Sequence, residues 1–208
     1  MHTKNLQNYN VYVSKKTYIN ILAICVGLIP TLWLIWLAIH SELGAEPIKK
    51  IIHTTGEWGL NFVVLALALR AFKKVPDNIW INMIHRIVGI FAYYYISLHF
   101  ITYIALEQFF DFNEILQDVS KHRRIIIGFI GYLLLSSVAI TSIKNVTDKI
   151  GYQMWKKVHG LAYFVPICGV IHYLWLVKKD IRIPLVYAFI VAFLIVFKRF
   201  LNSNKLSK

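Results

Sequence analysis

Charged residues and cysteines are both scarce in this chain of 208 residues. Only 16% of the residues are charged, against about 25% in a typical soluble domain, and 58% are hydrophobic. The two cysteines, Cys25 and Cys168, lie in apolar stretches, and the chain has neither a Cys-x-x-Cys pair nor a Cys-x-x-Cys-His motif. A disulfide framework, a thiolate metal site and a covalently attached c-type haem are therefore excluded. The chain also lacks a Gly-x-Gly-x-x-Gly motif, which argues against a dinucleotide-binding domain.

The hydrophobic residues are gathered into blocks of roughly 15 to 23 residues, the length that crosses a hydrocarbon core about 30 Å thick. The sequence therefore predicts an all-α integral membrane protein, a six-helix transmembrane bundle. We expect one transmembrane domain over residues 19–201, between a cytoplasmic N-terminal segment, 1–18, and a cytoplasmic tail, 202–208. The first block is longer than the apolar part of a signal peptide, so it is expected to be a retained helix. The six predicted helices are Ile19–Ile39, Trp58–Phe72, Ile84–Leu106, Ile125–Ile143, Val158–Val177 and Ile183–Leu201.

The formal net charge is +13. The basic residues flank the apolar blocks and form no single stripe, so the charge indicates the lipid bilayer and no nucleic acid as the partner. With six helices both termini lie on one side, and the segments on that side carry fifteen of the 23 lysines and arginines. Cytoplasmic loops are enriched in basic residues, which predicts that both termini are cytoplasmic. The turn between the second and third helices is expected at Pro76-Asp77-Asn78.

Four of the eight histidines fall on two of the predicted helices. His85 and His99 belong to the third helix, and His159 and His172 belong to the fifth, which runs in the same direction. His99 and His172 should therefore lie at one depth in the outer half of the membrane, and His85 and His159 near the inner end. An ionisable residue inside a membrane helix is costly and indicates a functional site.

Two imidazoles from opposite sides can supply both axial ligands of a haem iron. The histidine pattern therefore predicts haem between the third and fifth helices, with His99, His172, His159 and His85 as candidate ligands. His85 and His99 share a face, since fourteen residues fall about 40° short of four turns, but His159 and His172 lie about 140° apart on a straight helix. A kink at Pro166 would change that angle. For His85, beside Arg86, an interfacial cation explains the residue as well as ligation does.

Two other groups of polar residues each have two possible interpretations. Glu57 and Asn61, one turn apart, are compatible with a polar pocket, for example for a quinone, and also with a capped helix start. The segment from Glu107 to Asp118 carries four acidic residues on the predicted outer side. It is compatible with a docking loop for a soluble partner and equally with a solvated loop.

Seven segments, spread in matching order over about residues 17 to 200, resemble the MsrQ family, formerly YedZ, within the ferric-reductase-like transmembrane cytochromes. They are Leu-Ile-Pro-Thr-Leu-Trp-Leu-Ile-Trp (28–36), Gly-Ala-Glu-Pro-Ile-Lys (44–49), Thr-Gly-Glu-Trp-Gly-Leu (55–60), Arg-Ile-Val-Gly-Ile (86–90), Ser-Leu-His-Phe-Ile-Thr-Tyr (97–103), Trp-Lys-Lys-Val-His-Gly-Leu-Ala-Tyr (155–163) and Ile-His-Tyr-Leu-Trp (171–175).

The resemblance implies one or two b haems in the bacterial inner membrane, with His99, His172 and His159 as iron ligands. It further implies FMN as a cofactor and electrons from the quinone pool or a cytosolic flavin reductase. The electrons would leave to a periplasmic molybdopterin methionine sulfoxide reductase catalytic subunit of the MsrP type, which repairs oxidised proteins. This chain would then be an electron-transfer subunit whose catalytic site lies on the partner. Position 85 departs from the family, because arginine is expected there and the chain has histidine.

Two other functions fit parts of the pattern. A stand-alone transmembrane metal reductase would use the same haems, although such enzymes usually need a nucleotide-binding domain, for which these 208 residues leave no room. A small proton-coupled transporter could use the histidines and Glu57 instead. Only the first of these two binds haem, so an absorption spectrum separates them.

Overall fold

The computed structural model describes residues 2–72, 79–177 and 180–206, and every regular element in these ranges is a helix. The predicted turn at Pro76-Asp77-Asn78 lies outside them. The α-helices are α1 (His2–Ile39), α2 (Pro47–Phe72), α3 (Ile79–Thr102), α4 (Phe112–Lys121), α5 (Arg123–Thr141), α6 (Lys144–Gly160), α7 (Phe164–Leu176) and α8 (Arg182–Leu206). A π-helical turn, Tyr103–Glu107, follows α3, and a 3-10 turn, Leu161–Tyr163, joins α6 to α7.

Within the described residues, six segments are long and apolar enough to cross a membrane. The third combines α3 with its π turn, and the fifth combines α6, the 3-10 turn and α7. Apolar side chains such as Leu22 and Phe189 point outward, exposed by 64% and 74%, as expected where lipid is the solvent. The prediction of an all-α, multi-pass membrane protein with six spans is confirmed. The spans are Thr17–Ile39, Pro47–Phe72, Trp80–Glu107, Arg123–Thr141, Lys144–Leu176 and Arg182–Leu201.

The second span begins at Pro47, well before the predicted start at Trp58. The first turns of this helix contain polar residues, among them Lys49, His53 and Glu57. These residues interrupt the apolar block, so the sequence pattern did not predict this part of the helix. Proline is well suited to a first helical position because its missing N–H would have no partner there. The longer α2 carries Glu57 well inside the span.

The fifth span is not a straight helix. Pro166 has no N–H to donate to the carbonyl one turn earlier, and the chain tightens into the 3-10 turn just before it. Gly151, with φ of +75°, interrupts α6 nearer the membrane surface. The angle of about 140° calculated for His159 and His172 on a straight helix therefore does not apply.

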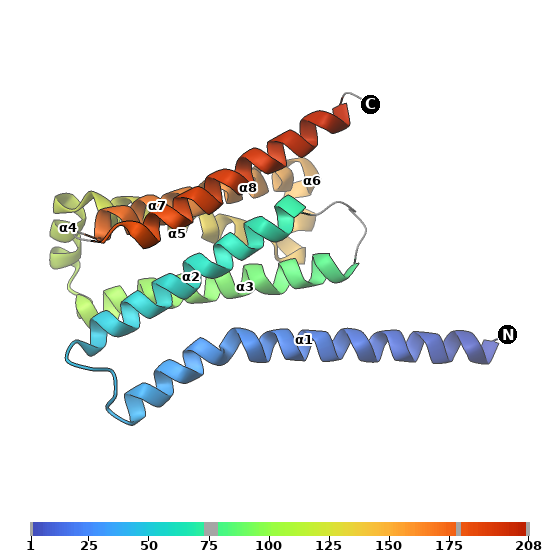
Figure 1. The fold of residues 1–208 in the computed structure, drawn as a ribbon, viewed down its shortest axis with the longest axis horizontal. Helices are drawn as coiled ribbons and strands as arrows, with labels where there is room; N and C mark the ends of the chain where they lie inside the picture. Colours follow the sequence, from blue (N-terminus) through green and yellow to red (C-terminus); the bar gives the residue numbers. More distant parts are fainter. Residues whose placement is uncertain (1, 73–78, 178–179, 207–208) are drawn as a thin grey trace.

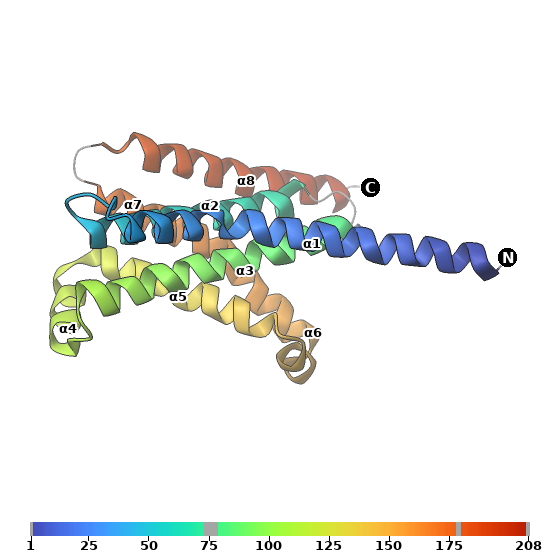
Figure 2. The ribbon, with the colours of Figure 1, turned by 90° about the horizontal axis from the view of Figure 1, so that it is seen from below.

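Helix α2 lies at the centre of the bundle. Its buried face contributes Leu67 and Ala71 to a core shared with α7 and α8, and Val63 to a second core shared with α3, α5 and α7. Figures 1 and 2 show α2, α3, α5, α7 and α8 running side by side, with α1 along one flank. Cys168 is buried in α7, and Cys25 lies on the exposed face of α1.

The fully buried Tyr95 fixes a bend in α1. Its hydroxyl donates to the Gly27 carbonyl (2.8 Å) and accepts from the Thr31 amide (3.2 Å), so it stands where the helical bond between those two groups would form. Pro30 lies in the same turn. A side chain inserted into the helical ladder beside proline produces a kink, and Figure 1 shows α1 bent along its length.

The two ends of the bundle differ. Figure 1 places both chain ends at one end of the molecule, as an even number of spans requires, with α4 at the other end. The loop that joins α1 to α2 also lies at the α4 end, as do the end of α7 and the start of α8 (Figure 2). This end corresponds to the predicted outer side.

Candidate functional site

His99 on α3 and His172 on α7 face each other inside the bundle. Their ring centres are 6.1 Å apart and their planes are 84° to one another. A metal–imidazole bond is about 2 Å, and the ring centre lies about 1 Å beyond the nitrogen, so two imidazoles on opposite faces of one iron would have centres roughly 6 Å apart. The structure thus brings together the two residues predicted as the outer pair, at a separation that fits axial ligation of one haem iron.

Both imidazoles are oriented by backbone carbonyls. The Nδ1 of His99 bonds to the Ile52 carbonyl of α2 at 2.9 Å, and the Nδ1 of His172 bonds to the Arg124 carbonyl of α5 at 2.6 Å. A carbonyl can only accept, so each Nδ1 must carry the proton and each Nε2 keeps its lone pair. Metal-ligating histidines almost always donate their second nitrogen in this way. The two side chains are therefore held in the tautomer that binds iron.

Glycine gives each ring its space. A Cβ added to Gly56 would lie 3.0 Å from Nδ1 of His99, and one added to Gly128 would lie 2.7 Å from Nδ1 of His172. Each glycine stands four residues after the carbonyl that its histidine binds, Ile52 on α2 and Arg124 on α5. The pairs α2–α3 and α5–α7 thus hold their histidines by the same local arrangement, a repeat that sequence comparison along the chain did not reveal.

The inner candidates are arranged differently. The Nε2 of His159 lies 3.4 Å from the Ser142 hydroxyl, and its ring packs 4.2 Å from that of Trp155. His85 is near enough to interact electrostatically with His159. Ligation of a second haem by His159 and His85 stays a prediction.

Arg70 of α2 belongs to this inner region as well. It donates to the His159 carbonyl at 3.1 Å and lies over the Tyr163 ring, 4.6 Å from its centre. Arg70 is among the fifteen basic residues on the predicted cytoplasmic side. Its position within an apolar block was the available signal for an interior role.

A polar cluster borders the outer pair. The Tyr187 hydroxyl of α8 donates to Oδ1 of Asn61 at 2.6 Å, and the Tyr187 ring lies 6.2 Å from that of Tyr173 on α7. Tyr173 and Tyr187 both lie close enough to Glu57 to interact electrostatically with its carboxylate. Asn61 therefore serves an interhelical contact deep in the second span, and the alternative of a capped helix start is wrong, since α2 starts at Pro47.

The acidic segment from Glu107 to Asp118 is mostly helical. Asp111 caps α4 by accepting from the amides of Asn113 and Glu114. Asp118 accepts from the Tyr103 hydroxyl at 2.9 Å and from His122 at 2.7 Å. Two of the four acidic side chains thus stabilise this chain, which leaves Glu107 and Glu114 as the carboxylates that a partner could meet.

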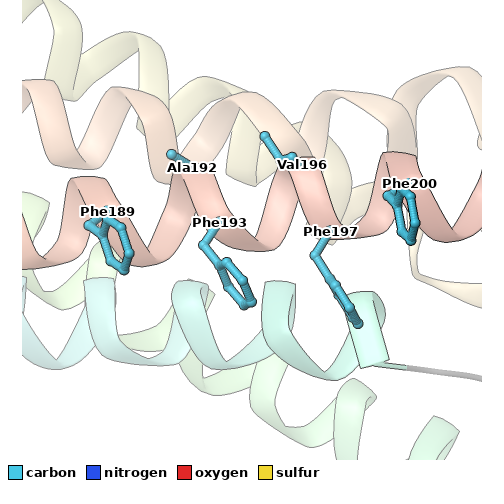
Figure 3. Close-up of a pocket in the computed structure, with 6 residues that line it drawn as sticks. All are labelled: Phe189, Ala192, Phe193, Val196, Phe197 and Phe200. Atoms are coloured by element: carbon cyan, nitrogen blue, oxygen red, sulfur yellow. The ribbon is translucent and has the colours of Figure 1, made fainter.

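Two surface grooves lie outside these clusters. One, of about 410 Å³, is lined only by α8 residues (Figure 3): Phe189, Ala192, Phe193, Val196, Phe197 and Phe200. Its apolar lining is typical of a lipid-facing surface. The other, of about 340 Å³, is basic and lies at the α4 end beside Trp175, with Lys121, His122, Arg123 and Arg124.

The fold and this site define the class of the protein: a multi-pass helical membrane protein with a pair of oriented histidines embedded between two spans. Residues 55–170 match the family of ferric reductase like transmembrane components. The chain is also similar to proteins named protein-methionine-sulfoxide reductase heme-binding subunit MsrQ. That of Caulobacter vibrioides is 34% identical, over 86% of this chain and 85% of the relative. That of Herminiimonas arsenicoxydans is 34% identical over 92% and 89%, and that of Rhodospirillum rubrum 35% over 81% of each.

This chain belongs to the MsrQ family, within the ferric reductase like transmembrane proteins. The resemblance stated from the sequence is confirmed.

Proposed function

We propose that this protein is a b-type cytochrome subunit that transfers electrons across the bacterial inner membrane to a periplasmic protein-methionine-sulfoxide reductase. The observation that carries the proposal is the His99–His172 pair, with a ring separation of 6.1 Å and both Nδ1 atoms bonded to carbonyls. The names of the relatives, heme-binding subunits of such a reductase, support the same function.

The residues present fit haem. His99 and His172 would hold it between α3 and α7, and Gly56 and Gly128, which have no side chain, leave room for the two rings. A haem with two imidazole ligands exchanges one electron at its iron. The chain's own contribution is to fix the tautomers, to exclude water and to hold both rings rigidly. His159, with His85, is proposed to hold a second haem nearer the inner surface.

The proposed electron route has an inner and an outer end. Electrons come from the quinone pool or from a cytosolic flavin reductase, and FMN is included because the resemblance implies it. The acceptor is a molybdopterin catalytic subunit of the MsrP type, which carries the reaction on methionine sulfoxide. Glu107 and Glu114, near α4 at the predicted outer end, are proposed to orient this partner on approach.

The electron-transfer proposal is tested on the purified protein in nanodiscs. We expect a Soret band that shifts to the red on reduction, and reoxidation of the reduced haem when the periplasmic reductase and methionine sulfoxide are added together. Replacing Glu107 and Glu114 by glutamine should slow that reoxidation most at low salt, because exposed charges are screened as salt rises. A purified protein that lacks the Soret band would contradict the proposal and favour the proton-coupled transporter.

The orientation follows from the basic residues, with residues 1–18 and 202–208 in the cytoplasm. An alkaline phosphatase fused after Lys208 should be inactive, because this reporter folds only in the periplasm. A fluorescent protein that matures only in the cytoplasm, fused at the same point, should fluoresce. The same two reporters inserted after Gly44, in the first outer loop, should give the opposite result. Phosphatase activity after Lys208 would reverse the inner and outer assignments.

A further inference from the structure

Four polar side chains from three helices meet beside the outer histidine pair. Glu57 and Asn61 lie one turn apart on α2, Tyr173 lies on α7, and Tyr187 lies on α8. The Tyr187–Asn61 hydrogen bond of 2.6 Å joins α8 to α2, and the Tyr187 ring lies 6.2 Å from that of Tyr173. The Glu57 carboxylate is near enough to both tyrosines to interact with them electrostatically. We refer to these four residues as the Glu57 cluster.

The Glu57 cluster lies at the depth of the outer pair. Glu57 follows Gly56, which abuts the His99 ring, and Tyr173 follows His172 in the chain. Ten residues separate Glu57 from the start of α2, so the carboxylate lies about 15 Å along the helix, inside the hydrocarbon region. The cluster therefore borders on the two imidazoles within the membrane.

The Glu57 side chain is nevertheless exposed at the surface of the bundle. Among the ion pairs that the described residues form, none involves it. A carboxylate facing lipid is expensive, and acidic residues kept at such positions commonly mark proton or ligand pathways. A ligand that satisfies this group must reach it sideways from the bilayer and must carry both apolar bulk and hydroxyl groups.

We propose that the Glu57 cluster binds the head group of a membrane-soluble hydroquinone and that Glu57 takes up its protons. This inference rests on the proposed function, since it names the site at which a quinol donor binds. Electrons from this donor enter at the outer pair, whereas electrons from a cytosolic flavin reductase enter at the inner end of the route. Asn61 and the two tyrosines bind the ring oxygens, and the Glu57 carboxylate accepts from a hydroxyl of the hydroquinone.

The chemistry balances with haem as the electron acceptor. Oxidation of a hydroquinone to a quinone breaks two O–H bonds and releases two electrons and two protons. The electrons leave one at a time to the haem iron, which takes no protons. Glu57 accepts one proton with each electron and releases it before the next. Because the Glu57 cluster lies at the depth of the outer pair, the protons leave toward the outer surface.

The test uses the full-length protein with haem in nanodiscs. A photoreactive azidoquinone is cross-linked and mapped by mass spectrometry, and haem reduction by decylubiquinol is followed anaerobically by stopped flow. Asn61→Leu should lose the cross-links that wild type forms near residues 57–61 and 173–187. Glu57→Gln should keep them, because the amide still binds, but should slow reduction about 100-fold, the contribution of a general base.

Two matched controls separate the cluster from its surroundings. Glu46→Gln changes an exposed carboxylate outside the spans, and Phe193→Ala changes the lipid-facing side of α8. Both should cross-link and react like wild type, and dithionite should reduce all variants equally. Wild-type reduction rates in Glu57→Gln, or cross-links only outside the cluster, would overturn the inference.

Failure of the underlying function gives a different result. If wild type contains no haem, the electron-transfer function and this inference both fail. If wild type contains haem that a flavin reductase reduces and decylubiquinol does not, only the hydroquinone site is wrong.

Discussion

Replacing either His99 or His172 by alanine should remove the haem between α3 and α7. Removing a residue that only orients a metal ligand lowers metal affinity by about 10- to 100-fold. Removing the ligand itself should lower the affinity for haem by more than this. We expect the outer haem to fall at least 10-fold in the pyridine haemochrome assay, normalised to protein. The protein should still enter the membrane, because neither imidazole belongs to the buried cores around α2.

His40→Ala is the matched control for that experiment. His40 is exposed at the end of α1 and bonds only to the neighbouring Trp36 carbonyl, so its removal should leave the haem content unchanged. His159→Ala should lose the inner haem alone, and His85→Arg should change the spectrum least, because the family resemblance implies arginine at this position. A full haem complement in His99→Ala or His172→Ala would show that the facing rings are a structural contact only.

The spans and the depth of the histidines could be predicted from the sequence because each depends on local information. The length of an apolar block determines whether it spans, and fixed rise per residue places His99 and His172 at one level. The predicted pairing of these two residues agrees with their ring separation of 6.1 Å. The start of α2 was missed since Lys49, His53 and Glu57 lower its hydropathy, although a helix continues through them.

The partners of the histidine rings could not be predicted. Whether the carbonyls of Ile52 and Arg124 accept from the histidines depends on how α2 packs on α3 and how α5 packs on α7. Every residue has a main-chain carbonyl, so the sequence does not show which one will accept. A bend was expected at Pro166, but its form, a 3-10 turn at Leu161–Tyr163, depends on the packing of the fifth span. A role for Tyr173 and Tyr187 was not predicted, because nothing in the sequence distinguishes them from other aromatic residues. Only the packing of α7 and α8 brings them close to each other and to Glu57.

Gly128→Ala should displace the His172 ring and lower haem affinity, even though alanine favours a helix over glycine by about 1 kcal/mol. The new Cβ would lie 2.7 Å from Nδ1, closer than packed atoms tolerate, and the ring that must move is the one bonded to the Arg124 carbonyl at 2.6 Å. Loss of such an orienting bond should weaken haem binding about 10- to 100-fold. Gly56→Ala, at 3.0 Å from His99, should act in the same direction and less strongly.

The chain provides two controls for that substitution. Gly131→Ala, one turn further along α5, would place a Cβ 3.1 Å from Cβ of Cys168 without touching a histidine, and Gly89→Ala on α3 meets nothing within 4 Å. Haem titration into each apoprotein, with its thermal unfolding measured in parallel, separates ring displacement from general packing damage. If Gly128→Ala binds haem as tightly as Gly131→Ala does, the carbonyl-bound orientation of His172 is not what holds the iron. If Gly128→Ala loses affinity while its apoprotein unfolds no earlier than the controls, the position of the ring determines the binding of haem.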